Sequence, residues 1–93
     1  PFDQLAEIVD AVGDKLDVIC EGGIHRGTHM LKALSLGAKA CSGGRLYLYA
    51  LAAGGQAGVE RAIEKYKTEL IRDMKLMGCT KISELNRNNL RFR

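Results

Sequence analysis

Two glycine-rich segments carry the residue types that could bind an anion. The first runs from Glu21 to Gly27 and the second from Ser42 to Arg45, and each contains two adjacent glycines with a basic side chain after them. Glycine lets the backbone approach a ligand closely and leaves amide N–H groups exposed as donors. An arginine guanidinium adds forked hydrogen bonds to phosphate oxygens. Each segment is therefore a candidate for one half of a phosphate site.

Each glycine segment is expected to follow a strand and to precede a helix. Residues 16–20 form a short apolar run rich in valine and isoleucine, which predicts a buried strand, and the short apolar stretch 38–42 predicts a second one. Strands that alternate with helices pair in parallel through right-handed crossovers. The two segments would then hold one phosphate from two sides, with the favourable dipole of a helix N-terminus beside it.

The rest of the chain predicts helices whose ends are marked by glycines. The predicted helices cover residues 2–12, 28–36, 46–53 and 57–77, and the glycines that end them are Gly13, Gly37, Gly54-Gly55 and Gly78. Thr28 is the expected N-cap of the second helix, and Thr80 that of a final turn through Leu85. In the longest helix, basic side chains alternate with acidic ones such as Glu69 and Asp73, which is typical of a solvated face.

Composition is that of a globular chain of at most one domain. The 93 residues are 46% hydrophobic and 27% charged, and the formal net charge of +3 is too small to argue for nucleic acid as a partner. No apolar run is long enough for a membrane span, and no secretory signal is present. Cys20, Cys41 and Cys79 form no CxxC pair, so neither a metal site nor a disulfide framework is supported. The odd cysteine count predicts a reducing, cytoplasmic location.

Glycines that only make turns are the alternative interpretation of either segment taken alone. Their matching places in successive strand–helix units favour the shared phosphate site. Neither segment fits the dinucleotide fingerprint GxGxxG after a strand or the GK[ST] of a P-loop. Two parallel strands cannot satisfy their own edges, and a complete eight-fold barrel needs ~250 residues. Because the chain also begins without methionine, we expect it to be a fragment of a larger α/β fold.

Three stretches resemble the C-terminal end of the FMN-dependent α-hydroxy acid dehydrogenase/oxidase family. They read EGGIHRGTHMLKALSLGAKA, GGRLYLYALAAGGQAGVERAIE and DMKLMGCTKISEL. The resemblance implies the C-terminal part of a (β/α)8 TIM barrel over residues 1–85, in the order helix, strand seven, helix seven, strand eight, helix eight, and a basic tail over residues 86–93. It also implies FMN as the cofactor. For the whole enzyme it implies oxidation of an L-2-hydroxy acid, L-lactate first, to the 2-oxo acid.

The same resemblance implies a cofactor-binding set at the phosphate end of FMN. The family's loop after strand seven reads Asp-Gly-Gly-Ile/Val-Arg and its loop after strand eight reads Gly-Arg; these map onto Glu21, Gly22, Gly23, His25, Gly44 and Arg45. Glu21 replaces an aspartate and His25 an arginine. A histidine is mostly neutral at pH 7 and lacks the fork, so we expect weaker phosphate binding. The neighbouring Arg26 is an alternative partner, but it points in a different direction on the loop.

No catalytic residue and no metal ligand is assigned to this chain. The family's base is a histidine of a His-Gly-Gly-Arg segment that lies upstream, and the contacts to the 2-hydroxy acid are upstream as well. Neither His25 nor His29 stands in such a segment, and His29 is expected to lie exposed on a helix. The resemblance therefore makes the chain part of an enzyme, inactive by itself, and leaves the choice of oxidase or dehydrogenase undefined.

Two other functions stay open at this point. One is a non-catalytic module that binds FMN or another phosphate, or that self-associates through its open sheet. The other is a mycofactocin-type oxidoreductase that acts on a modified peptide. Exposed strand edges predict a homo-oligomer. Arg87, Arg91 and Arg93 are expected in a solvated tail, and peripheral membrane association remains an option for the whole enzyme.

Overall fold

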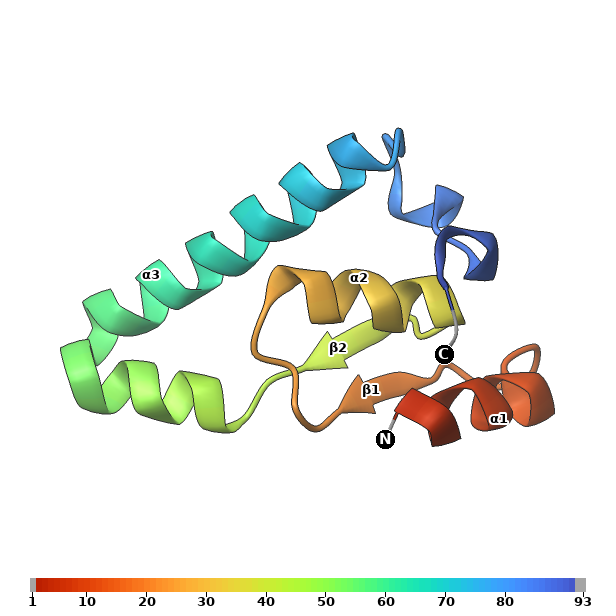
Figure 1. The fold of residues 1–93 in the computed structure, drawn as a ribbon. Coiled ribbons are helices and arrows are strands. Elements are labelled where there is room, and N and C mark those ends of the chain that lie inside the picture. The colour runs from red at the N-terminus through yellow and green to blue at the C-terminus, as the bar shows by residue number, and fades with distance from the viewer. Residues whose placement is uncertain (1, 92–93) are drawn as a thin grey trace.

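The computed structural model describes residues 2–91, which form three helices around a short parallel sheet (Figure 1). Helices and strands alternate as the sequence predicts. The elements are α1 (Phe2–Val12), β1 (Ile19–Glu21), α2 (Gly27–Leu36), β2 (Ala40–Ser42) and α3 (Arg45–Leu76), followed by the 3-10 turns Ile82–Glu84 and Arg87–Asn89. Among residues 2–91, no helix combines the length and the apolar character that crossing a membrane requires.

The two strands pair in parallel, in the register that sets Cys20 beside Cys41 and Glu21 beside Ser42. The predicted start of the first strand at Leu16 is wrong, because β1 begins at Ile19 and the Leu16 side chain is 61% exposed. Only three residues of each strand pair within this sheet. Because the strands are parallel, their carboxyl ends lie at the same edge of the sheet, and the two glycine segments begin there.

Glycines end the helices where the sequence predicts. After α2, Gly37 adopts φ 114° and its N–H donates to the carbonyl of Leu34, while Ala38 N–H donates to the carbonyl of Ala33. This is the left-handed helix end that glycine permits without strain. Gly55, with φ 60° and ψ −144°, interrupts α3. The chain reverses there, so that α3 has two arms (Figure 1).

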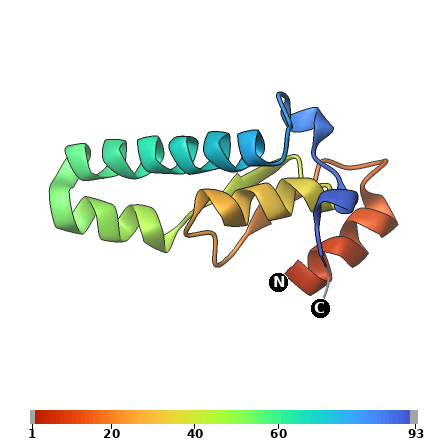
Figure 2. The ribbon, with the colours of Figure 1, turned by 45° about the horizontal axis from the view of Figure 1, so that its top comes forward.

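The core lies between α2, the sheet and the second arm of α3. Buried side chains from α1, β1, the following loop, α2 and α3 form its main cluster; they include Leu5, Cys20, Ile24, Leu36 and Tyr66. A second cluster holds Leu31, Met74 and Leu85. The second arm of α3 runs along α2 in both ribbon views (Figures 1 and 2). This packing of α3 against α2 is what brings distant residues to the loop after β1.

Apolar side chains are exposed on the sheet and on the first arm of α3. Ile19 is 62% exposed, and Leu48 and Tyr49 are 63% and 64% exposed. Tyr47, by contrast, is half-buried with its ring edge-on to Tyr66. Self-association through this open sheet stays a prediction.

The segment after α3 is fixed more firmly than a solvated tail. Arg87 forms an ion pair with Asp10 of α1 at 2.8 Å and donates to the carbonyl oxygens of Ala6 and Leu36. The expectation of a solvated Arg87 is thus wrong, and Arg93 lies outside the described residues. Thr80 is not the N-cap of the following turn, because Lys81 holds that position.

Candidate functional site

The two glycine segments meet at one edge of the sheet. Because Glu21 pairs with Ser42, both loops leave the strands at the same level. A hollow of about 330 Å³ is lined by all six residues that the sequence analysis selected, together with Ile24, Ser42 and Leu46; the six are Glu21, Gly22, Gly23, His25, Gly44 and Arg45. The prediction that these residues lie together is confirmed. Their roles toward a cofactor stay a prediction.

The loop after β1 needs its glycines for conformation. Gly22 has φ 108° and Gly23 has φ 70°, in the region that residues with a side chain rarely adopt. A Cβ at either position would meet no atom within 4 Å, so crowding is not the reason for glycine here. The turn these residues make leaves their backbone on the wall of the hollow, where amide N–H groups can reach an anion.

The loop after β2 leads directly into the N-terminus of α3. Gly44 is the N-cap, no side chain caps this end, and the first turn contains no acidic residue. Arg45 is the first helical residue, and its exposed guanidinium stands on the same hollow. Uncapped amides, the helix dipole and a cation all favour a bound anion. The donor set of this hollow therefore fits a phosphate group.

Glu21 is the one acidic group on the wall of the hollow. A Cβ placed on Gly44 would lie 3.8 Å from Glu21 Oε1, which shows how closely the carboxylate approaches the second loop. A carboxylate repels phosphate but accepts hydrogen bonds from hydroxyl groups. The hollow thus presents donors for an anion and one acceptor beside them.

His25 and His29 are linked through the backbone. The His25 N–H donates to His29 Nδ1 at 3.1 Å. Burial lowers the pKa of His29, and the nearby positive charge of Lys32 lowers it further. The expectation of an exposed His29 is wrong, because its side chain is half-buried. A neutral imidazole can accept this hydrogen bond at Nδ1, and in that form His29 holds the loop.

Arg26 points to α3 and forms an ion pair there with the buried carboxylate of Glu69, while its own side chain stays 57% exposed. Its Nε donates to Glu69 Oε2 at 2.7 Å and to Oε1 at 3.2 Å. Burial alone would raise the pKa of the Glu69 carboxyl, but the hydrogen bonds and charge of Arg26 outweigh it and lower that pKa. Arg26 is not among the residues on the hollow, so it does not replace the arginine missing at His25.

Two acidic residues of α3 contradict the predicted solvated face, whereas Glu64 and the basic residues beside them are exposed as predicted. Glu69 is only 5% exposed, and Asp73 is half-buried and accepts a 2.6 Å hydrogen bond from Thr28 Oγ1. That hydrogen bond lowers the pKa of Asp73. Thr28 is accordingly not the helix cap predicted for it; Arg26 takes the N-cap position, without a side-chain cap.

A further contact that sequence reasoning missed comes from Tyr66. Its hydroxyl donates to the carbonyl oxygen of Ile24, at 2.5 Å, and both residues are buried. Tyr66 lies within the longest predicted helix, where nothing in the sequence pattern marks its hydroxyl as a contact to the loop. Only the folded chain shows that it reaches the loop, because 42 positions separate it from Ile24.

The cysteines beneath the loops are not activated. Burial raises the pKa of Cys41 to about 11, and burial also raises that of Cys20. A thiol is a weak nucleophile until it ionises. Within residues 2–91, no three His, Cys, Asp or Glu side chains are grouped so as to hold a metal ion.

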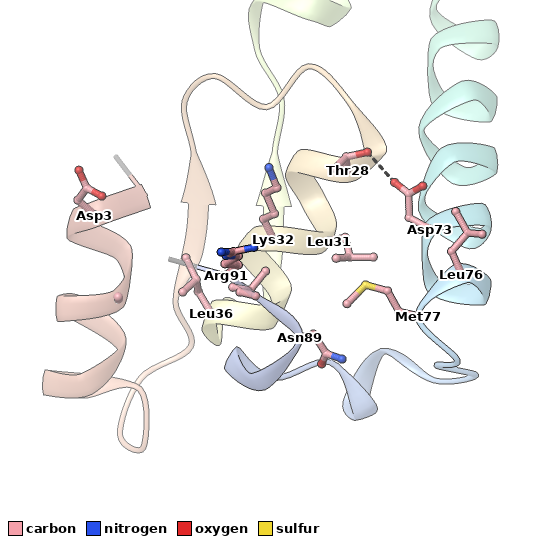
Figure 3. Close-up of a pocket in the computed structure, with 12 residues that line it drawn as sticks. Asp3, Thr28, Leu31, Lys32, Leu36, Asp73, Leu76, Met77, Asn89 and Arg91 are labelled. Carbon is pink, nitrogen blue, oxygen red and sulfur yellow. Dashed lines mark hydrogen bonds between the residues drawn. The ribbon is translucent and has the colours of Figure 1, made fainter. Parts of the chain in front are cut away.

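A second, larger hollow of about 1020 Å³ lies along α2 (Figure 3). Its lining comes from α1, α2, the end of α3 and the C-terminal segment, and includes Leu31, Leu36 and Met77. Figure 3 shows Thr28 and Asp73 facing each other at its rim. None of the six residues selected as the cofactor site lines this hollow.

Comparison with known proteins supports one family over almost the whole chain. The family model described as FMN-dependent dehydrogenase matches residues 1–92. L-lactate oxidase from Nostoc sp. is 46% identical over 85 residues, which is 91% of this chain and 23% of that protein. The chain thus spans about a quarter of the length of the curated relatives it matches.

Solved structures agree in fold. The flavin-binding domain of baker's yeast flavocytochrome b2 is 45% identical to this chain, with a TM-score of 0.87. The match covers 95% of this chain and 24% of the yeast chain. The (S)-mandelate dehydrogenase from Pseudomonas putida is 35% identical with a TM-score of 0.93, and covers 100% of this chain and 26% of its own. These are FMN-dependent TIM-barrel enzymes, so the chain has the fold of a part of that barrel.

Proposed function

The chain belongs to the FMN-dependent dehydrogenase family, an enzyme family with FMN as its cofactor, and we propose that it provides the FMN phosphate-binding end of an enzyme that oxidises an L-2-hydroxy acid. The observation that carries this proposal is the shared hollow, where two glycine loops at the same edge of a parallel sheet bring amide donors and Arg45 together. In the barrel numbering, we assign β1 to strand seven and β2 to strand eight.

Each residue on the hollow has a distinct task in this proposal. The amides after Gly22 and Gly23 and those at the start of α3 donate to the phosphate, and Arg45 adds a charged, forked contact. The His25 imidazole on the hollow is a further hydrogen-bond donor, and unlike an arginine it carries no permanent charge. Glu21 accepts a hydrogen bond from a hydroxyl of the ribityl chain rather than contacting the phosphate itself.

The proposed reaction removes two hydrogens from the substrate as a hydride and a proton. When bound, FMN supplies the acceptor for the hydride that leaves C2 of the hydroxy acid, while the hydroxyl proton goes to a base and a 2-oxo acid forms. No described residue of this chain is proposed as that base, because His25 is engaged at the phosphate end and His29 accepts the His25 N–H. L-lactate is proposed as the substrate because several relatives carry lactate in their names.

The proposal is tested by comparing FMN with riboflavin, which lacks the phosphate. We expect titration followed by flavin fluorescence to show tighter binding of FMN, and Arg45→Ala to weaken FMN binding by about 10-fold or more, because a charged hydrogen bond contributes ~1.5–3 kcal/mol. Riboflavin binding should stay unchanged. Arg61→Ala, an exposed arginine on the second arm of α3, is the matched control.

Two results would remove the phosphate assignment. One is equal affinity for FMN and riboflavin in the unmodified protein. The other is an Arg45→Ala variant that binds FMN as tightly as the Arg61→Ala control does. Because no base is proposed in this chain, the non-catalytic module is tested in the full-length enzyme, where a preference for FMN without oxidation of 2-hydroxy acids would favour it.

A further inference from the structure

One face of α3 supports the loop after β1 from behind. Tyr66, Glu69 and Asp73 follow one another at spacings of three and four residues, which places them on the same side of the helix. Each makes a polar contact to the loop or to the first turn of α2. They bind Ile24, Arg26 and Thr28 respectively, across 42 to 45 positions of sequence.

These contacts hold the backbone of the loop after β1 in place, in addition to joining α3 to α2. Ile24 is 4% exposed and lies between Gly23 and His25, both of which line the phosphate hollow. Its carbonyl oxygen is held by the Tyr66 hydroxyl. Arg26, one position after His25, is held by two hydrogen bonds to the buried carboxylate of Glu69. The segment 24–26 therefore cannot shift without breaking bonds to α3.

Close backbone packing adds to this support. A Cβ at Gly27 would lie 2.5 Å from the Cβ of Glu69 and 2.6 Å from the backbone nitrogen of Leu70. Such distances are below any real contact, so the start of α2 and this face of α3 approach as closely as glycine allows. The same part of α3 therefore holds the loop both by polar bonds and by close packing.

From this arrangement we propose that Tyr66 and Glu69 are positioning residues for the FMN phosphate, acting through Ile24 and Arg26, and that Arg26 serves the support and not the phosphate. The inference rests on the proposed function. It assigns control of phosphate affinity to two side chains that do not line the hollow. Preorganised donors bind an anion more tightly than donors that must be ordered on binding.

Tyr66→Phe is the sharpest variant, because it removes one hydroxyl and keeps the ring. We expect it to weaken FMN binding between about 3-fold and 10-fold, the value of one ordinary hydrogen bond, and to leave riboflavin binding unchanged. Affinities are measured at a temperature where circular dichroism shows each variant fully folded. Tyr49→Phe, an exposed tyrosine on the first arm of α3, is the matched control.

Glu69→Gln tests whether releasing Arg26 from its ion pair weakens or tightens FMN binding. If Arg26 belongs to the support, Glu69→Gln and Arg26→Ala both weaken FMN binding, and the double variant is no weaker than the worse single one. If Arg26 were a phosphate ligand held back by Glu69, releasing it would tighten FMN binding, and that result would overturn the inference. Glu64→Gln, on an exposed part of the same helix, is the control.

The outcomes separate this inference from the proposed function. Equal binding of FMN and riboflavin by the unmodified protein defeats the proposed function. A protein that prefers FMN, and loses that preference in Arg45→Ala but keeps it fully in Tyr66→Phe, defeats the positioning inference alone. Should Glu69→Gln fail to fold, Tyr66→Phe decides.

Discussion

The two glycine loops look alike in sequence but are held in different ways. The loop after β1 is supported by residues far along the chain, Tyr66 and Glu69. Tyr66 binds the buried Ile24 of the loop. The loop after β2 depends on what immediately follows it, since Gly44 caps α3 and the Tyr47 ring lies against Gly43. One loop is positioned by tertiary packing and the other by the helix it begins.

This difference separates the two tasks of a phosphate site. The loop after β2 brings a permanent cation and helix amides, which attract an anion whatever the rest of the fold does. The loop after β1 has no such cation on the hollow, because Arg26 is bound to Glu69 and His25 stands in its place. Its contribution depends on accurate placement of backbone donors. The loops should therefore respond differently to changes in their surroundings.

The largest contrast is expected from alanine at one glycine of each loop region. Gly27→Ala should lower the free energy of unfolding by about 2–3 kcal/mol, because its Cβ would overlap Glu69 and the backbone of Leu70. Gly44→Ala should cost less than about 1 kcal/mol, because its Cβ would meet only Glu21 Oε1 at an ordinary 3.8 Å. Urea unfolding measures both.

Equal losses in the two variants would contradict the comparison. They would mean that the second loop is packed as tightly as the first. A large loss in Gly44→Ala with a small one in Gly27→Ala would reverse it.

The next effect in size is the pH dependence of the support. The pKa of Glu69 and that of Asp73 are both lowered by their partners, so their contribution to stability is present above the ordinary carboxyl range near pH 4 and is lost as pH falls through the lowered values. Glu69→Gln should reduce the free energy of unfolding by about 1–2 kcal/mol at pH 7, a modest value because Arg26 is more than half exposed.

The difference between the unmodified protein and Glu69→Gln should shrink as pH is lowered from 7 to 3. Urea unfolding at several pH values checks this, with Glu64→Gln as the variant expected to stay within about 0.5 kcal/mol throughout. A difference that stays constant down to pH 3 would show that the ionised carboxylate is not what Arg26 stabilises.

Local patterns were enough to predict the loops. The patterns that predict these features involve only neighbouring residues: glycine at a strand end, an apolar run, and glycine at a helix end such as Gly37. The parallel order of the strands follows from their alternation with helices. The kink at Gly55 was predicted for the same reason. The resemblance then selected the six residues that the fold brings to one hollow.

The support of the first loop could not be predicted from the same patterns. Glu69 and Asp73 alternate with basic residues, as on a solvated helix face, and only packing against the start of α2 buries or half-buries them, next to Arg26 and Thr28. Thr28 has the residue type of a helix cap, but its hydroxyl binds Asp73 instead. Arg87 is held by Asp10, 77 positions away. In each case a polar residue was given its most frequent local role, and a distant partner determined the outcome.

The smallest expected effect concerns the missing cation of the first loop. His25→Arg should place a forked, permanently charged donor on the hollow and tighten FMN binding by about fivefold, with no change for riboflavin. The gain is limited because residue 25 is exposed to solvent, which screens the charge. His25→Lys supplies charge without the fork, so a smaller gain in Lys than in Arg would show that geometry matters beyond charge. If His25→Arg leaves the affinity for FMN unchanged, the backbone of the first loop, rather than its basic side chain, carries that loop's share of phosphate binding, and the two loops differ even more than their sequences suggest.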